Sequence, residues 1–172
     1  VKSGEVDVAF TNATAVRARD MDFGPPFLEI ELGYLVPRGS ALTTPAEVDA
    51  SGLRVGVTAG SSSDATLSRD FEHAQIVRAA TFDVAIEMMS TGAINAYATN
   101  KAALFEMAEK LPGSKVLEGR WGIERHAIAI PKGREQAMAF IRQFTREVKS
   151  EGVVGAGIAR AGLRGATISA AE

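Results

Sequence analysis

The sequence predicts an α/β fold in which a mostly parallel sheet is covered by helices. From Leu53 onward, short apolar segments typical of strands alternate with segments whose apolar residues recur at helical spacing. Three consecutive strand–helix units of this kind favour parallel strands joined by crossover helices. The chain length of 172 residues fits one ordinary domain or two small lobes.

Composition and charge exclude several classes of protein. Apolar residues make up 46% and charged residues 23% of the chain, which is typical of a globular protein and argues against disorder or a coiled coil. A net charge of -2 with no sustained basic run argues against a nucleic-acid-binding surface. The absence of cysteine excludes disulfides, thiol catalysis and Cys-ligated metal sites, and it leaves the redox compartment open.

The first part of the chain predicts two strands. Gly4 is typical of a helix C-cap, so we expect a fragment or processed product whose targeting segment, if any, preceded it. Val6–Phe10 has the pattern of a buried strand, and the prolines at Phe23–Pro26 stop any helix. Leu28–Val36 predicts the second strand, which ends at a turn.

The remaining elements follow from periodicity, caps and glycine or proline stops. Strands are expected at Leu53–Val57, around Ile76–Val77, at Ile94–Ala98 and at His126–Ile130. Helices are expected after the cap residues Ser61–Asp64, from Thr81 to Gly92, around Leu104–Leu111, over 134–150, and from Gly152 to about Leu163. The small-residue tail Ala166–Glu172 is expected to be frayed.

The loop after the strand at Leu53–Val57 is a candidate anion site. Gly60 followed by Ser61, Ser62 and Ser63 joins a strand to a helix start, where free backbone N–H groups and the helix dipole favour an anion. Ordinary helix capping by serine explains the same residues equally well. The loop lacks the Gly-Lys-Ser/Thr ending of a nucleotide-binding phosphate loop and the glycine spacing of a dinucleotide fingerprint.

Two further polar segments follow predicted strands. Thr11, Asn12, Thr14 and Arg17 gather hydroxyl, amide and guanidinium groups, and an arginine fork matches a carboxylate, although a solvated surface arginine is the more common outcome. Asn100 closes the segment Asn95–Lys101 at a strand's carboxyl end, where open α/β sheets bind ligands, or it is simply a helix cap.

Other polar residues predict no chemistry. The two histidines, His73 and His126, lie far apart with no partner at metal spacing, and His126 is expected to be structural. The scattered carboxylates, among them Asp64 and Glu124, give no reason to pair an acid with a base. Trp121 indicates packing, or stacking on a ligand if it lies near a cleft. No metal, cofactor or catalytic residue is therefore expected.

Taken together, these motifs resemble the bacterial extracellular solute-binding proteins of family 3, which serve ABC importers for polar amino acids. The similarity is carried by Gly4-Glu5-Val6-Asp7-Val8, by Thr14-x-x-Arg17 followed by Asp22-Phe23 and Pro26, by Leu53-x-Val55-Gly56-Val57 leading to Gly60-Ser61-Ser62, and by Asn95–Asn100.

The resemblance implies the two-lobed type II periplasmic-binding fold. Residues 1–35 would form part of lobe 1, residues 36–125 lobe 2, and residues 126–172 the return to lobe 1, with the first half of lobe 1 missing. The family closes its lobes on the ligand like a hinge. Carried over by position, Arg17 would clamp the ligand carboxylate, with lobe-1 contacts from Thr11, Asn12 and Thr14. Lobe-2 contacts would come from Ser61, Ser62, Ser63 and Asn100.

Three departures from the family pattern leave alternatives open. If the family pattern is aligned by counting residues from Asp7, Arg19 takes the position of the arginine that binds the ligand carboxylate, instead of Arg17. Asn100 replaces the carboxylate that meets the ligand's ammonium, which favours a ligand with little or no positive charge. Without the first half of lobe 1, the strand at 28–36 and the helix at 134–150 would expose apolar faces, covered by a partner chain in a homo-oligomer or by a segment once present.

The resemblance therefore implies a binding module without enzymatic activity, located in the periplasm or otherwise outside the cytoplasm. Its partners would be a small carboxylate ligand, amino acid or organic acid, and the membrane subunits of an importer. One alternative is a dehydratase of cyclohexadienyl acids, since some of these enzymes resemble this fold. Another is a ligand-sensing domain of a receptor or regulator.

Overall fold

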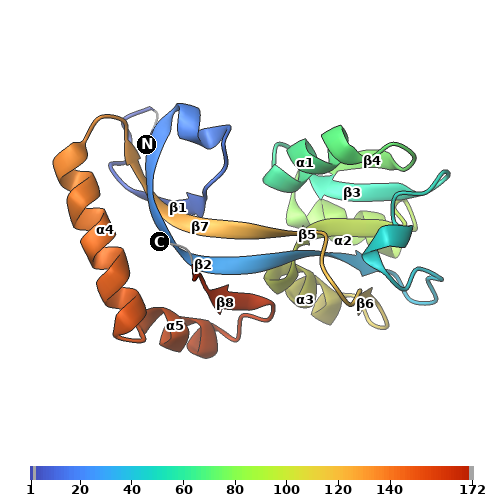
Figure 1. Cartoon of the computed structure of the whole chain (residues 1–172). Helices are drawn as coiled ribbons and strands as arrows, with labels where there is room; N and C mark the ends of the chain where they lie inside the picture. The colour runs from blue at the N-terminus through green and yellow to red at the C-terminus, as the bar shows by residue number, and fades with distance from the viewer. Residues whose placement is uncertain (2, 171–172) are drawn as a thin grey trace. The chain divides into compact units, whose positions relative to one another are not determined.

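The computed structural model describes residue 1 and residues 3–170, and these residues form two compact units. Unit 1 comprises residues 1–30 and 124–172, and unit 2 comprises Glu31–Ile123. Two strands, β2 (Met21–Val36) and β7 (Gly122–Pro131), run from one unit into the other (Figure 1). The lobe boundaries predicted from the sequence, at 35/36 and 125/126, lie a few residues later along β2 and β7 than the boundaries between these two units.

Unit 2 contains the alternating strands and helices. Strands β3 (Arg54–Thr58), β4 (Gln75–Ala79) and β5 (Ala96–Asn100) pair in parallel, with β3 between the other two. Each is followed by a helix, α1 (Ser62–Asp70), α2 (Phe82–Ser90) or α3 (Lys101–Lys110). The carboxyl ends of the three strands therefore lead directly into the amino ends of three helices.

The remaining pairings in unit 2 are antiparallel. The end of β2 lies between β5 and the short strand β6 (Lys115–Val116). A short 3₁₀ helix, η2 (Pro45–Glu47), lies in the connection from β2 to β3. The sheet is thus mixed, where the sequence predicts a mostly parallel one.

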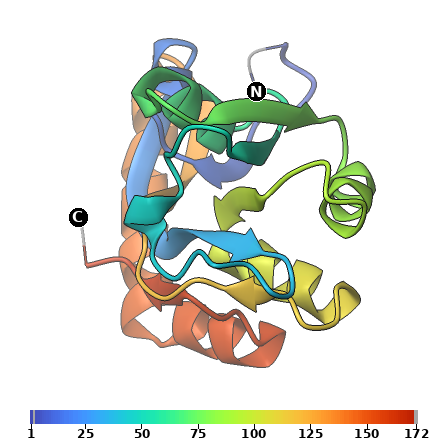
Figure 2. The same cartoon turned by 90° about the vertical axis from the view of Figure 1, so that its right-hand side faces the viewer.

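Helices cover both faces of the unit 2 sheet. On one face Leu67 of α1 packs with Tyr34, Val55 and Val57, and Trp121 borders this cluster. On the other face, residues of α2 and α3 form a second cluster with Leu35 and Tyr97. Figure 2 looks at this unit from the side of its helices and loops. The core explains why apolar residues recur at helical spacing in all three helices.

Unit 1 is a small antiparallel sheet with one long helix against it. Strand β1 (Ala9–Asn12) pairs with β7, and β8 (Ala166–Ile168) pairs with β2. Helix α4 (Glu135–Ser150) contributes Ile141 to a cluster with Ile128 and Ile130 of β7. A 3₁₀ turn, η1 (Arg17–Arg19), precedes β2, and α5 (Val153–Ala161) precedes β8.

Two predictions for unit 1 are wrong in detail. The first strand begins at Ala9 and extends to Asn12, because its antiparallel partners in β7 run from Ala129 to His126, while Val6 and Val8 are exposed. The tail is not frayed throughout, because residues 166–168 pair with Leu28–Ile30 of β2. Residues 171 and 172 of the predicted frayed tail lie outside the described residues.

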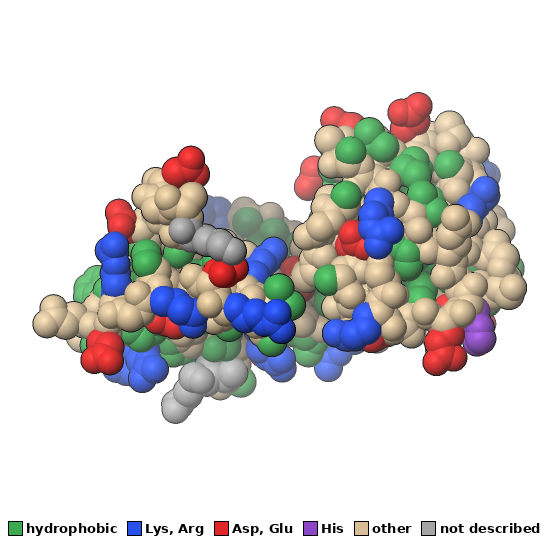
Figure 3. All heavy atoms as spheres, turned by 90° about the horizontal axis from the view of Figure 1, so that it is seen from above, with side chains coloured by type: hydrophobic (Ala, Val, Ile, Leu, Met, Phe, Trp, Pro, Cys, Tyr) green, Lys and Arg blue, Asp and Glu red, His purple; other side chains and the backbone are tan. Residues whose placement is uncertain are grey.

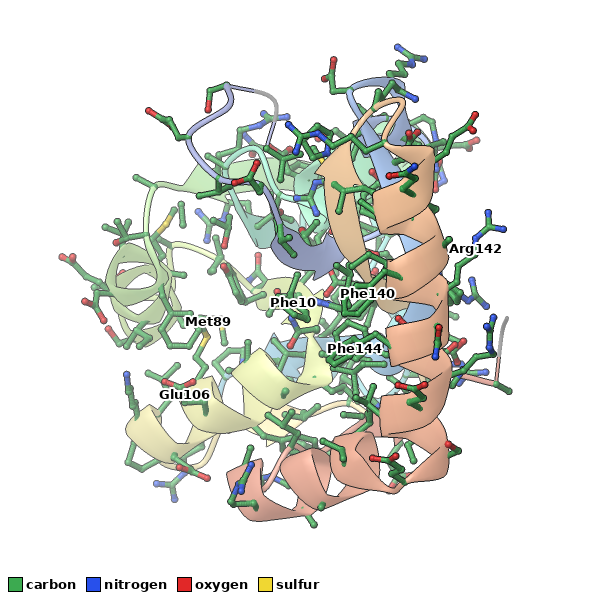
Figure 4. All side chains as sticks on the ribbon, turned by 90° about the vertical axis from the view of Figure 1, so that its left-hand side faces the viewer. Phe10, Met89, Glu106, Phe140, Arg142 and Phe144 are labelled. Carbon is green, nitrogen blue, oxygen red and sulfur yellow. The ribbon has the colours of Figure 1, made fainter. Side chains whose placement is uncertain are left out.

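Exposed apolar surface is found on α4 but not on β2. The β2 residues from Ile30 to Val36 that carry large side chains are mostly buried, because neighbouring strands and the unit 2 core cover them, so that part of the prediction is wrong. Phe140 and Phe144 of α4 and Phe10 of β1 are exposed by 65%, 37% and 65%. Figure 4 shows the three rings on one flank of α4 and Arg142 on the other. We call Phe10, Phe140 and Phe144 the aromatic patch.

The surface carries both signs of charge. Basic and acidic side chains are interspersed on the face drawn in Figure 3. Among the helices of the described residues, none has the length and apolarity required to cross a membrane.

Candidate functional site

In unit 1 the structure brings together the four polar residues singled out in the sequence. Nη1 of Arg17 donates to Oγ1 of Thr11 at 2.7 Å and to the carbonyl oxygen of Asn12 at 3.1 Å. The backbone N–H of Arg17 donates to Oγ1 of Thr14 at 3.2 Å, which fixes the start of the turn. A half-buried guanidinium is therefore anchored at the end of β1.

The guanidinium is anchored through one of its three nitrogens. Both hydrogens of Nη1 are used by Thr11 and Asn12, and no acceptor for Nε or Nη2 of Arg17 lies among the described residues. Nε and Nη2 are the parallel pair of donors that matches the two oxygens of a carboxylate. Arg19, two residues further on, is exposed and lies at the end of η1.

Asn12 joins this cluster to the crossover strand β7. Its side-chain oxygen accepts the backbone N–H of Arg125 at 3.1 Å, and the next residue, Ala13, donates its N–H to the carbonyl of Arg125 at 2.8 Å. Asn12 is therefore positioned by β7 and in turn positions Arg17.

In unit 2 the loop from Thr58 to Ser63 starts α1. Ser61 is the N-cap, and its Oγ accepts the N–H of Asp64 at 3.1 Å, so the capping role considered for the serines holds for Ser61. Ser62 and Ser63 are the first two residues of the helix. Ser61 and Ser62 are half-buried, whereas Ser63 is buried.

Asp64 and Arg78 form an ion pair at this loop that was not predicted from the sequence. One oxygen of the buried Asp64 carboxylate accepts the N–H of Gly60 at 3.0 Å. Nε of Arg78 donates to the same carboxylate at 3.0 Å, and Ser68 donates to it as well. The ion pair joins β4 to α1, so it holds the loop that presents the serines. No sequence signal pairs residues this far apart.

The other polar residue predicted in unit 2, Asn100, caps a helix. Its Oδ1 accepts the N–H of Ala103 at 3.0 Å at the start of α3. The hydroxyl of Thr58, the last residue of β3, lies 2.6 Å from the hydroxyl of Tyr97, the second residue of β5. The starts of α1 and α3 are thus fixed on neighbouring parallel strands.

A histidine and a carboxylate meet in unit 1. Nε2 of His126 lies 3.2 Å from Oε2 of Glu124, and Glu124 is buried. His126 is the register partner of Asn12, so this pair lies beside the arginine cluster on β7. Across the part of the chain that the structure describes, no group of three or more acidic, His or Cys side chains could hold a metal ion.

The Asp64 network predicts a loss of stability in acid. Burial raises the pKa of Asp64, but hydrogen bonds from Gly60, Arg78 and Ser68 outweigh it and hold the pKa below its ordinary value of 3.8. A carboxyl whose pKa is lower in the folded state contributes stability above the unfolded value, and this is lost as pH falls through the folded value. We expect the free energy of unfolding from urea titrations to fall below about pH 4. In the Asp64→Asn variant the free energy of unfolding should fall less steeply with decreasing pH. Equal pH dependence in the wild type and the variant would show that Asp64 is not the source of the acid sensitivity.

No family model matches the chain. The ABC transporter glutamine-binding protein GlnH of Bacillus subtilis is 24% identical over 154 residues, covering 88% of this chain and 56% of that protein. A probable histidine-binding protein of Neisseria gonorrhoeae is 22% identical over 159 residues, with coverages of 88% and 59%. The chain spans little more than half the length of these curated relatives.

Solved structures show the same fold. The solute receptor for L-cysteine of Neisseria gonorrhoeae superposes with a TM-score of 0.81 at 24% identity, covering 94% of this chain and 66% of the other. The ancestral amino-acid-binding protein AncCDT-1, a precursor of cyclohexadienyl dehydratase, has a TM-score of 0.81 at 17% identity, with coverages of 95% and 71%. The chain thus has the type II periplasmic-binding fold, and its resemblance to the family 3 amino-acid-binding proteins of ABC importers is confirmed.

Proposed function

We propose that this chain is the solute-binding component of an ABC importer and binds a small carboxylate-bearing molecule. The relatives whose names state a function are binding proteins for amino acids, which supports binding without turnover. The fold supports the same function, because type II binding proteins respond to a ligand that both lobes contact.

The observation that carries this proposal is the anchored guanidinium of Arg17. Thr11 and Asn12 hold it through Nη1, which leaves Nε and Nη2 as a ready pair of donors for a carboxylate. A side chain held in this way loses little conformational entropy on binding, so its hydrogen bonds favour the complex. Thr14, which fixes the turn, belongs to the same half of the site.

Unit 2 supplies the second set of groups. The start of α1 offers the half-buried hydroxyls of Ser61 and Ser62 and the positive end of the helix dipole. Ser63 contributes through its backbone, because its side chain is buried. By the family resemblance, Arg17 and this loop would hold the same ligand carboxylate.

Asn100 defines the class of ligand. An amide oxygen accepts a hydrogen bond from an ammonium without charge assistance, which roughly halves the strength of that bond. Because Asn100 already accepts the N–H of Ala103, a ligand ammonium would share this oxygen with a backbone donor. The site therefore favours organic acids or amino acids whose amine is weakly bound.

A thermal-shift screen tests this ligand class. We expect carboxylic acids that lack an amine to raise the melting temperature at least as much as amino acids with the same carbon skeleton, because a ligand that binds only the folded state stabilises it. An Asn100→Asp variant should shift the preference toward the amino acid by restoring charge assistance. A screen in which neither class raises the melting temperature would reject the function.

The protein partners would be the membrane subunits of the importer. The location would be the periplasm or another space outside the cytoplasm, as the family resemblance implies.

The alternative of a ligand-sensing domain makes a different prediction. An encoding gene that continues into a membrane span or a DNA-binding domain would support the sensor, and a secretion signal without such an extension would support the importer component.

The aromatic patch supports a second proposal, that two copies of the chain associate through unit 1. Among the described residues, β1 ends the strand order of the sheet and no strand pairs with its outer edge, and Phe10 lies on this strand. Two copies related by a twofold axis can pair their β1 edges and bury the three phenylalanines against each other. Sedimentation of a concentration series should show a dimer that Phe10→Ser weakens, and a monomer at all concentrations would reject it.

A dehydratase of cyclohexadienyl acids is the second candidate function. The pair of Glu124 and His126 beside Asn12 is the observation that favours it, because such an enzyme needs a carboxylate as acid or base near the bound acid. The likeness to the AncCDT-1 structure supports the fold only. Turnover of prephenate or arogenate by the purified protein, abolished in Glu124→Gln, would establish this activity, and binding without turnover would reject it.

A further inference from the structure

Unit 2 holds a cavity that the carboxylate site does not use. Its volume is about 590 Å³, and it lies between the end of α1, the η2 segment and the strands β2 and β7. The residues that line it include Tyr34, Asp49, Asp70, Phe71, Arg120 and Trp121. None of the predicted ligand-binding residues is among its lining residues.

Three aromatic residues, Tyr34, Phe71 and Trp121, contribute to the cavity wall. The indole of Trp121 lies over Tyr34 with ring centroids 6.0 Å apart. Nε1 of Trp121 donates to the carbonyl of Gly33 at 3.0 Å, so the indole has a fixed orientation. Phe71, just past the end of α1, is only partly buried. These rings offer an apolar surface and π faces that attract a cation.

Asp49 supplies a carboxylate that forms no ion pair with Lys or Arg among the described residues. Its Oδ1 accepts the N–H groups of His73 and Ala74, and its Oδ2 accepts only the N–H of Glu72 at 2.9 Å. A carboxylate oxygen has two lone pairs, so Oδ2 retains one acceptor position. The N–H groups of Glu72, Ala74 and His73, together with the charge of His73, hold the pKa of Asp49 below its ordinary value, so the carboxylate is ionised at pH 7.

A second polar group in the wall lacks a partner. The Tyr34 side chain is only 1% exposed, and its hydroxyl makes no hydrogen bond within the part of the chain that the structure describes. Among the described residues, Oγ1 of Thr145 is the only fully buried side-chain polar atom without a hydrogen-bond partner, so the Tyr34 hydroxyl retains some contact with solvent and can form a hydrogen bond to a ligand. Burial raises the pKa of Tyr34, as does the nearby charge of Asp49, so the phenol stays neutral and can donate or accept.

The other charged groups at the cavity are already paired. Asp70 is held by Arg69 through two hydrogen bonds, at 2.6 and 2.9 Å. Nη1 of Arg120 lies 3.3 Å from Oε1 of Glu31. The groups that can still accept or donate a hydrogen bond in the cavity are therefore the Asp49 carboxylate and the Tyr34 phenol, beside aromatic rings.

From these observations we propose that the cavity is a second binding site for a small organic ammonium ion with an apolar body. The ammonium donates to Oδ2 of Asp49 and to the Tyr34 hydroxyl, and the apolar body packs on Trp121 and Phe71. This site is independent of the carboxylate site, because it needs neither Arg17 nor the serine loop.

A series of probes that differ only in charge tests the proposal. Protonated benzylamine, benzyl alcohol and benzoate are titrated at pH 7 while the fluorescence of Trp121, the only tryptophan in the chain, is recorded. We expect benzylamine to bind at least about tenfold more tightly than benzyl alcohol and benzoate to give no saturable change, since a tenfold ratio needs only about 1.4 kcal/mol of charge attraction. Equal binding of benzylamine and benzyl alcohol, or no binding of either, would overturn the proposal.

Variants assign the signal to the cavity. Tyr34→Phe keeps the ring and should weaken benzylamine about 2- to 10-fold by removing one hydrogen bond. Asp49→Asn should abolish the preference for benzylamine over benzyl alcohol, with its melting temperature measured to confirm folding. Arg17→Ala is the matched control and should leave the titration unchanged. If Arg17→Ala removed the signal, or if Tyr34→Phe and Asp49→Asn both left it intact, the second site would be rejected while the carboxylate site would stand.

Discussion

Replacing Arg17 by alanine is expected to weaken binding of the best carboxylate ligand by about 30-fold or more. The substitution removes a charge-assisted pair of hydrogen bonds to a carboxylate, and the loss of a buried, hydrogen-bonded charge pair costs about 2–5 kcal/mol. The shift in melting temperature that the ligand produces should largely disappear, as measured by thermal shift and by calorimetric titration.

Two variants serve as controls for Arg17. Arg17→Lys keeps the positive charge but loses the parallel donors, so its affinity should lie between those of the wild type and Arg17→Ala. Arg19→Ala removes an exposed guanidinium at the end of η1 and should leave affinity unchanged. If Arg19→Ala weakened binding while Arg17→Ala did not, the alternative assignment of the clamp to Arg19 would be correct.

Gly56→Ala is expected to lower the free energy of unfolding by about 1–3 kcal/mol. A Cβ at this position of β3 would meet the side chain of Ile94, and it would lie 2.9 Å from Cδ2 of Tyr97. Both neighbours are fully buried, so they have little room to move. For a chain of this size the melting temperature should fall by about 2–12 °C.

Gly157→Ala is the matched control for the same chemical change. Gly157 lies in α5, and an added Cβ would have no heavy atom within 4 Å. Since alanine is favoured over glycine in a helix by about 0.5–1 kcal/mol, this variant should be slightly more stable than the wild type. Equal effects of the two substitutions would show that crowding at β3 is not the cause.

The helices of unit 2 could be predicted because their signals are local. Thr81 accepts the N–H of Val84 as a cap, and Gly92 follows the last turn of α2 with a positive φ of 70°. Such contacts join residues three or four apart, so a short stretch of sequence contains both partners. The position of β1 and the presence of β8 depend instead on pairing with β7 and β2, far away in the chain.

The residues of the candidate site also differ in whether their contacts are local or distant in the sequence. Thr11, Asn12, Thr14 and Arg17 lie within seven positions, and their cluster follows from one turn after β1. The ion pair of Asp64 and Arg78 and the cavity between Tyr34, Asp49 and Trp121 join residues from separate elements. In isolation each of these residues has an ordinary surface or core role, so only the packed structure shows what they form together.

Asn12 couples the guanidinium of Arg17 to the backbone of β7. Its side chain accepts the backbone of Arg125 in a strand that continues into unit 2, while its carbonyl holds the guanidinium of Arg17. A change in the backbone torsions of β7 near Arg125 therefore reaches the guanidinium through a single residue. By reciprocity, a molecule that immobilises the guanidinium biases those torsions by the same free energy.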